Sequence, residues 1–309
     1  MRETKVANAT RHRIAQRRHP ISSEPATPPG ADARPCGLAR PWHRPPRMGR
    51  ADLVLSREAP PARVVADLAA RLGEAEAALV RVITALSRLE PVSAEVAALA
   101  GVQVRPVPPC IPLGALPVHA DAVGMRFVTV VDLLGDQGLL AASAYRALRA
   151  RTADVTPLVR RWMTGASARD GRDALALRIA GVAMRPLLRH LSQSLEPADA
   201  PPCSASGHCP YCDGEPDFST PARAARVLYC ARCDAAWRAP RAGCAFCRET
   251  RPDRLAFRRT GEPPYGLEVC ASCRHYLKSV EVPVSEYLAI ERALSAPLDS
   301  GARAAGLVG

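Results

Sequence analysis

Four pairs of cysteines, each with the pattern Cys-x-x-Cys, dominate the last third of this 309-residue chain. The eight residues are Cys209, Cys212, Cys230, Cys233, Cys244, Cys247, Cys270 and Cys273. One Cys-x-x-Cys turn directs two sulfurs toward an ion, and two such turns complete a tetrahedral site of four thiolates. In a long chain without a secretory signal, this pattern indicates metal ligands and not a disulfide framework. The sequence therefore predicts two four-cysteine metal sites.

The spacing favours consecutive pairing of the four turns. Seventeen residues separate the first turn from the second, and 22 separate the third from the fourth. Zinc ribbons use separations of roughly 15–20 residues. Cross-braced and nested pairings are the alternatives. A nested inner site would use the ten residues between Cys233 and Cys244, and the outer turns would then close a longer loop at a greater cost in chain entropy.

The cofactors that we expect are two metal ions, iron or zinc. Tetrahedral thiolate coordination suits both metals, so the spacing does not choose between a structural zinc ion and rubredoxin-like iron. The remaining cysteines, Cys36, Cys110 and Cys203, are expected to be free or buried thiols. His208 and His275 lie beside cysteine turns, where we expect surface or supporting positions and not ligation.

The N-terminal part divides into a basic extension and a helical region. Residues 1–50 hold eleven Lys/Arg, three Asp/Glu and eight Pro, a composition typical of disorder, and Met48 is a candidate alternative start. Residues 60–196 form the predicted α-helical domain, because apolar side chains recur there at helical spacing. The expected helices cover about 63–90, 120–134, 136–151, 156–163 and 173–195, with a proline-rich connector at 101–117.

Beyond residue 196 the helical periodicity ends. We expect a linker at 196–207, a metal-ribbon domain at 203–283 with short strands near 255–258, 267–269 and 276–282, and a C-terminal segment at 284–309 with a helix at 285–294 and a tail. The predicted fold class is α+β. An all-α N-terminal domain is followed by two tandem rubredoxin-like or zinc-ribbon four-cysteine modules.

Charge and motifs argue against several classes of function. The net charge is +12, but residues 203–280 hold twelve Lys/Arg and eight Asp/Glu. Two loaded four-thiolate sites would bring that region close to neutral, unlike a nucleic-acid surface. A solvated face is expected for the local patch of Arg251, Arg254, Arg258 and Arg259. The sequence contains no P-loop, dinucleotide fingerprint or nucleophile elbow.

The chain is expected to be cytoplasmic, without membrane insertion. No stretch approaches the roughly 18 apolar residues that a membrane helix needs. The N-terminus is basic but has no apolar core after its charges, unlike a secretory signal.

At these cysteine turns the sequence resembles the formate dehydrogenase accessory protein family, FdhE. The resemblance rests on GHCPYCDGEP at Gly207–Pro216, RVLYCARCDAAWRAPRAGCAFC at Arg226–Cys247, and LEVCASCRHYLKSVEV at Leu267–Val282. The terminal APLDSGARAAG also resembles the closing segment of the family, and the helical region matches weakly in RPLLRH. This chain departs from the family in having Asp213 before Gly214, where the family often has Gly directly after its first pair.

The resemblance implies a cytoplasmic accessory protein and not an enzyme. Its partner would be the catalytic subunit of a molybdenum- or tungsten-dependent formate dehydrogenase, which needs the accessory protein for activity. Members of the family are associated with rubredoxin-like iron, so the resemblance gives iron as much weight as zinc. A zinc-ribbon nucleic-acid-binding protein, driven by the basic N-terminus, is the alternative. A third hypothesis is a rubredoxin-type electron carrier. This hypothesis gives the helical domain no role.

Overall fold

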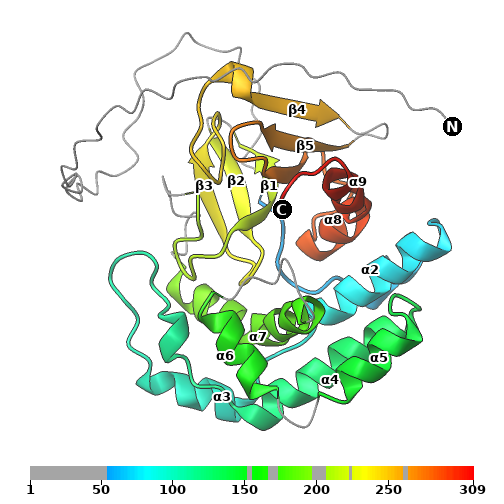
Figure 1. Ribbon diagram of the computed structural model, residues 1–309, viewed down its shortest axis with the longest axis vertical. Coiled ribbons are helices and arrows are strands. Elements are labelled where there is room, and N and C mark those ends of the chain that lie inside the picture. Colours follow the sequence, from blue (N-terminus) through cyan, green and yellow to red (C-terminus); the bar gives the residue numbers. More distant parts are fainter. Residues whose placement is uncertain (1–53, 152–154, 166–172, 197–206, 223–224, 260–263) are drawn as a thin grey trace, which may run out of the picture. The chain divides into compact units, whose positions relative to one another are not determined.

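The computed structural model describes residues 54–151, 155–165, 173–196, 207–222, 225–259 and 264–309 (Figure 1). The basic segment 1–50, with Met48, lies outside these residues, and so do Cys36 and Cys203. The disorder that we expect for 1–50 therefore stays a prediction.

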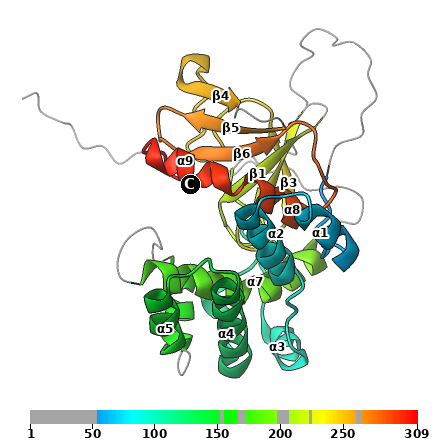
Figure 2. The ribbon, with the colours of Figure 1, turned by 90° about the vertical axis from the view of Figure 1, so that its right-hand side faces the viewer.

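Helices fill the described chain up to residue 195 (Figures 1 and 2). They are α1 (Ala62–Ala69), α2 (Glu74–Ser87), α3 (Ser93–Ala98), α4 (Ala120–Asp136), α5 (Ala142–Arg149), α6 (Thr156–Met163) and α7 (Ala174–Leu195). The 3-10 turn η1 (Leu99–Gly101) directly follows α3, and η2 (Leu113–Ala115) lies in the proline-rich connector. Pro186 lies in the interior of α7. Among the described residues, none of the helices combines the length and the hydropathy that crossing a bilayer requires.

The single helical stretch expected at 63–90 is wrong, because the structure divides it into α1 and α2. Helix α1 ends at Ala69, and Gly73, which has extended backbone angles, directly precedes α2. The resulting turn lets the apolar faces of the two helices meet. Val65 and Leu68 of α1 pack in one cluster with Val80 of α2. Burial of this shared face compensates for the interrupted helix.

The C-terminal part contains one six-stranded sheet with the order β3-β2-β1-β6-β5-β4. The strands are β1 (Pro216–Pro221), β2 (Ala225–Cys230), β3 (Ala236–Pro240), β4 (Leu255–Arg259), β5 (Tyr265–Cys270) and β6 (Tyr276–Val280), with η3 (Pro252–Arg254) before β4. All neighbouring strands are antiparallel except β1 and β6, which run parallel. That parallel junction has only two register pairs, at Phe218 and Ser219.

The sheet consists of two modules with the same order of parts. In the first module, a cysteine turn precedes the β1–β2 hairpin, and a second cysteine turn separates β2 from β3. In the second module, the remaining cysteine turns occupy the same places before β4 and between β5 and β6. The predicted class, a helical region followed by two tandem four-cysteine modules, is confirmed by this arrangement. Strands β1, β2 and β3 were not among the expected strands.

The helices and the sheet share the main hydrophobic core. Phe127 of α4 and Leu188 of α7 belong to the same buried cluster as Leu228 of β2, Trp237 of β3 and Leu277 of β6. Trp237 is fully buried there. The boundary between domains that we expect near residues 196–203 falls largely on residues outside the described chain, so it stays a prediction.

The C-terminal tail expected after residue 294 is wrong, because this segment is structured. Helix α8 (Leu288–Ser295) is followed directly by α9 (Pro297–Ala304), and α8 packs against α2. The chain end then contacts the second module, where the Tyr276 N–H donates to the Val308 carbonyl at 3.0 Å. Asp299 of α9 accepts hydrogen bonds from Tyr276 Oη at 2.8 Å and from Lys278 Nζ at 2.9 Å.

A buried ion pair joins α3 to α4 and α7. Both terminal nitrogens of Arg126 donate to the Glu95 carboxylate, and Arg126 Nε donates to the Ala183 carbonyl at 2.7 Å. Glu95 also accepts the Val92 N–H at the start of α3. Both side chains are almost completely buried. Each charge therefore depends on the other for its solvation.

We expect Arg126→Met to lower the free energy of unfolding by about 3–5 kcal/mol, because it leaves the Glu95 carboxylate buried without a counter-charge. The double variant Glu95→Gln/Arg126→Met should regain part of that loss, since no lone charge remains. Urea unfolding of the three proteins measures the difference. Equal losses in the single and double variants would contradict the role of the uncompensated charge.

Candidate metal centres

All four cysteine turns have the same backbone geometry. In each turn the N–H of the first cysteine donates to the carbonyl five residues later, at 2.8–3.0 Å. The N–H of the residue after the second cysteine donates back to the first cysteine carbonyl, at 2.8–3.2 Å. Such a tight loop presents both sulfurs on one side. The sequence repeats this turn four times. In each module one hairpin brings two turns together, so four cysteines meet in each module.

The residue that follows each second cysteine takes a left-handed backbone conformation. These residues are Asp213, Asp234, Arg248 and Arg274, with φ between 57° and 62°. Glycine adopts this conformation without steric cost, whereas other L-residues do so at a penalty. Gly214 is required for space and not for a positive φ. A Cβ at Gly214 would lie 2.7 Å from Cys230 Sγ, so the glycine leaves room for the sulfur of the facing turn.

The first two turns bring their sulfurs together in what we call the core centre, made of Cys209, Cys212, Cys230 and Cys233. Three of its sulfur–sulfur distances are 3.4, 3.5 and 3.6 Å. Every one of these cysteines is 2% exposed or less. All four belong to the main hydrophobic core that the helices share with the sheet.

The last two turns form the rim centre, made of Cys244, Cys247, Cys270 and Cys273. Cys244 Sγ lies 3.6 Å from Cys273 Sγ, and Cys247 Sγ lies 3.7 Å from Cys270 Sγ. Only Cys270 is buried, while Cys247 is exposed and the other two are intermediate. The two centres together correspond to consecutive pairing, the arrangement that the spacing favours.

The sulfur geometry fits a tetrahedral thiolate ion. Four sulfurs about 2.3 Å from a zinc ion would be separated by about 3.8 Å, and the observed 3.4–3.7 Å is close to this value. Without a cation the core centre could not remain fully ionised. Hydrogen bonding with Cys209 raises the pKa of Cys212, and burial raises the pKa of Cys233. A bound divalent cation would reverse this preference and hold the thiolates.

The two histidines beside the turns are not members of either sulfur cluster among the described residues. His208 Nδ1 lies 3.3 Å from the Asp213 carbonyl oxygen. The His275 ring stacks on Phe246 with ring centroids 4.6 Å apart, and its Nδ1 lies 3.1 Å from the Cys273 carbonyl oxygen. These are the supporting positions that the sequence suggests. Cys110 also lies outside both clusters, although its backbone N–H donates to the Pro210 carbonyl within the first turn.

Polar side chains from three helical residues hold the second turn of the core centre. Arg292 of α8 donates to the Cys230 carbonyl at 2.8 Å, Arg185 of α7 donates to the Ala231 carbonyl at 2.7 Å, and Ser192 of α7 donates to the Cys233 carbonyl at 3.3 Å. These contacts fix the backbone that carries the ligands. Sequence reasoning missed them, because the residues lie far from the turn along the chain.

Asp234 is the centre of the same network. It forms ion pairs with Arg292 at 2.5 Å, with Arg189 at 3.7 Å and with Arg185 at 3.8 Å. Burial disfavours its ionised form, but the arginines outweigh burial and hold the pKa of Asp234 below its usual value. Arg292 also pairs with Asp217 of β1 at 2.8 Å. The left-handed residue of the turn is thus tied to both α7 and α8.

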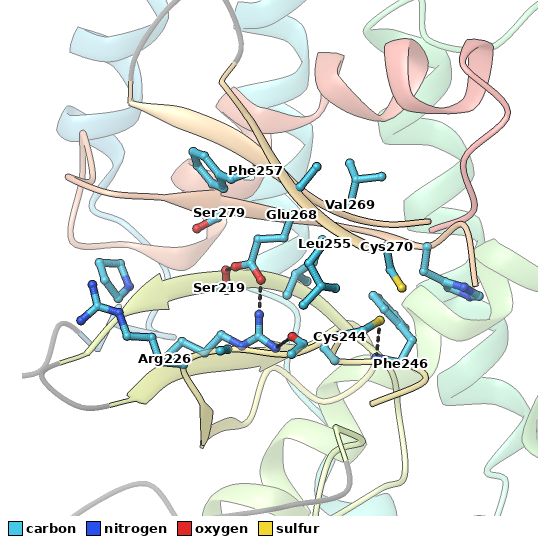
Figure 3. A pocket seen from close by; sticks show the side chains of 18 of the residues that line it. Ser219, Arg226, Cys244, Phe246, Leu255, Phe257, Glu268, Val269, Cys270 and Ser279 are labelled. Carbon is cyan, nitrogen blue, oxygen red and sulfur yellow. Dashed lines mark hydrogen bonds and ion pairs between the residues drawn. The ribbon is translucent and has the colours of Figure 1, made fainter. Parts of the chain in front are cut away.

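A cavity of about 580 Å³ opens between the two modules, next to the rim centre (Figure 3). Its floor carries an ion pair between Arg226 of β2 and Glu268 of β5, and Ser219 Oγ donates to Glu268 at 2.7 Å. Cys244 and Cys270 contribute to its lining, and so does Phe257, which is 45% exposed. The cavity therefore has both apolar and polar lining residues, and it borders the rim centre at Cys244 and Cys270.

Comparisons with known proteins find a similarity among solved structures. No protein-family model matches the chain, and no curated protein matches it. Among solved structures, the chain is similar to the crystal structure of the FdhE protein from Pseudomonas aeruginosa, with 21% identity and a TM-score of 0.49. That similarity covers 80% of this chain and 90% of the other. The functional proposal therefore rests on the residues of this chain.

We expect Arg248→Gly to be more stable than Arg248→Ala by about 1 kcal/mol, because only glycine adopts the left-handed conformation without a steric penalty. Both variants remove the same exposed side chain, so their difference isolates the backbone. Thermal unfolding of the zinc-loaded variants provides the measurement. An alanine variant as stable as the glycine variant would show that the turn does not require a positive φ.

Elemental analysis should find two equivalents of zinc or iron in the purified chain. Cys247→Ser should lower this to about one equivalent, because a site that loses one thiolate of four binds its ion more weakly. Cys110→Ser, which changes a thiol outside both centres, should keep two. A Cys247→Ser protein that kept both ions, or lost both, would contradict two separate centres.

Proposed function

We propose that this chain is a formate dehydrogenase accessory protein of the FdhE type. In this role it binds the catalytic subunit of a molybdenum- or tungsten-dependent formate dehydrogenase that matures in the cytoplasm, and that enzyme needs it for activity. The chain itself is not an enzyme in this proposal. The observation that carries the proposal is that the three segments resembling the family are the segments that build the four cysteine turns.

Residues outside the turns support the same assignment. The Tyr-Leu-Lys sequence after the last pair and the terminal APLDSGARAAG both resemble the family, and 17 residues separate them along the chain. In the fold they meet, because Tyr276 and Lys278 both donate to Asp299 of the terminal segment. Leu277, between them, belongs to the main core. The resembling residues therefore support one another structurally.

The docking surface in this proposal is formed by the sheet and the helices together. The core centre fixes the first module to α7 and α8, and the second module places the cavity and the rim centre at the surface. Iron or zinc would stabilise that shape. Bound iron would in addition supply a one-electron change, with one unit of charge between its two oxidation states at each centre.

The ion pairs of the second module weigh against the alternative of a nucleic-acid-binding zinc ribbon. In the patch of four arginines near β4, Arg251 pairs with Glu249, Arg254 with Asp253 and Arg259 with Glu281. A surface for phosphates keeps a clear positive excess. These pairs reduce that excess, in line with a solvated face.

Affinity capture with the tagged chain from a cytoplasmic extract of its source should recover a formate dehydrogenase catalytic subunit. Cys230→Ser should recover much less of it, because the core centre holds the docking surface together. Cys110→Ser is the matched control and should capture as much as the unchanged protein. Mass spectrometry of the captured proteins provides the measurement.

Two outcomes would contradict the accessory role. One is recovery of nucleic acid or transcription proteins without any dehydrogenase. The other is undiminished capture by Cys230→Ser, which would show that docking does not depend on the core centre.

A further inference from the structure

The two centres differ in how their sulfurs meet solvent. The core centre has no ligand more than 2% exposed, and it lies in the main core. In the rim centre, Cys247 is exposed, and Cys244 and Cys273 are intermediate. A chelator or another thiol can therefore approach the rim centre directly, whereas the core centre must first open.

The contacts that close the core centre come from distant parts of the chain. Helices α7 and α8 donate to the carbonyls of the second turn through Arg185, Ser192 and Arg292. The connector before α4 donates to the first turn through the Cys110 and Ile111 N–H groups, at 3.1 and 2.7 Å. Opening the core centre requires these tertiary contacts to separate, which is a large structural fluctuation with a high free energy.

Several side-chain contacts around the rim centre are local and exposed, although Ala245 and Phe246 of the third turn also pack against the main core. Ser272 in the fourth turn donates to Glu249 at 2.6 Å, and Glu249 also pairs with Arg251. The Ala271 N–H donates to the Arg254 carbonyl at 2.8 Å. These partners belong to the second module itself. Cys247 is itself exposed, so its sulfur can leave the ion without separating the contacts that Ala245 and Phe246 make with the core.

From this contrast we infer that the rim centre is the metal-exchange site of the protein, whereas the core centre keeps its ion for the lifetime of the fold. The exchanging ion is a thiophilic divalent cation of the zinc or ferrous class. On release, one cation passes to the competing chelator or thiol ligand, and the four rim-centre thiolates take up protons as the metal leaves. This inference rests on the proposed metal binding at both centres, and it adds a division of labour between them.

The test uses the full chain loaded with two equivalents of Zn²⁺ and mixed with an excess of the chromophoric chelator 4-(2-pyridylazo)resorcinol. We expect two phases of one equivalent each, with the first at least about ten-fold faster, the ratio that about 1.4 kcal/mol of opening free energy produces. Trp162 lies 5.4 Å from the Arg232 guanidinium of the second turn, and Trp237 is in the core cluster. Tryptophan fluorescence should therefore change in the slow phase and not in the fast one.

Two variants assign the phases to the centres. Cys247→Ser should remove the fast phase and leave the slow one. Ser192→Ala should accelerate the slow phase and leave the fast phase unchanged. It removes the hydroxyl that the Arg189 carbonyl, at 3.0 Å, and the Cys233 carbonyl, at 3.3 Å, share as a donor. Because this substitution deletes a single hydroxyl, the variant should remain folded, and it tests the hydrogen bonds around the core centre without removing a metal ligand.

The outcomes separate this inference from the proposals on which it rests. A single phase that releases both ions, or a fast phase that changes tryptophan fluorescence, would overturn the inference alone. A chain that binds fewer than two zinc ions would overturn metal binding and the inference together. Biphasic release from a chain that captures no dehydrogenase would support the inference and contradict only the accessory role.

Discussion

The carboxylate of Asp234 lies among three arginines, directly after the last ligand of the core centre. Arg185 and Arg189 come from α7, and Arg292 comes from α8. A buried carboxylate is costly unless it is paired, and paired charges are costly to separate. This constraint holds the turn, the long helix and the C-terminal helix in one arrangement. The position of the first module relative to the helices depends on it.

The two modules have the same order of turns and strands but different surroundings. The first module is enclosed by helices on the side of its cysteine cluster. The second module joins the first through two parallel register pairs, the Arg226–Glu268 ion pair and core residues such as Leu277. Gly207 permits a close approach between the modules, since a Cβ there would lie 1.8 Å from the Ala245 carbonyl oxygen. The two modules therefore hold their cysteine clusters in different surroundings. The core centre lies within the main core, and the rim centre lies at the edge of a cavity.

The sequence predicted the local chemistry better than the packing. The spacing of the cysteines favoured the consecutive grouping, because that grouping depends on short hairpins. Strand β2 was missed because its sequence, ARVLYC, has almost no exposed position and so lacks the alternation that marks a half-buried strand. Helix α9 was missed because PLDSGARA combines a proline, a glycine and few apolar residues. The network around Asp234 joins residues separated by about fifty positions or more, and no local pattern reveals it.

The residues with a left-handed backbone conformation are acidic beside the core centre and basic beside the rim centre. Asp213 and Asp234 occupy these positions beside the core centre, and Arg248 and Arg274 occupy them beside the rim centre. A four-thiolate site with a divalent ion has two negative charges, which the charges of the two nearby arginines would offset. A protein surface could then approach that ion without a long-range electrostatic barrier, and the rate of encounter there would depend only weakly on ionic strength.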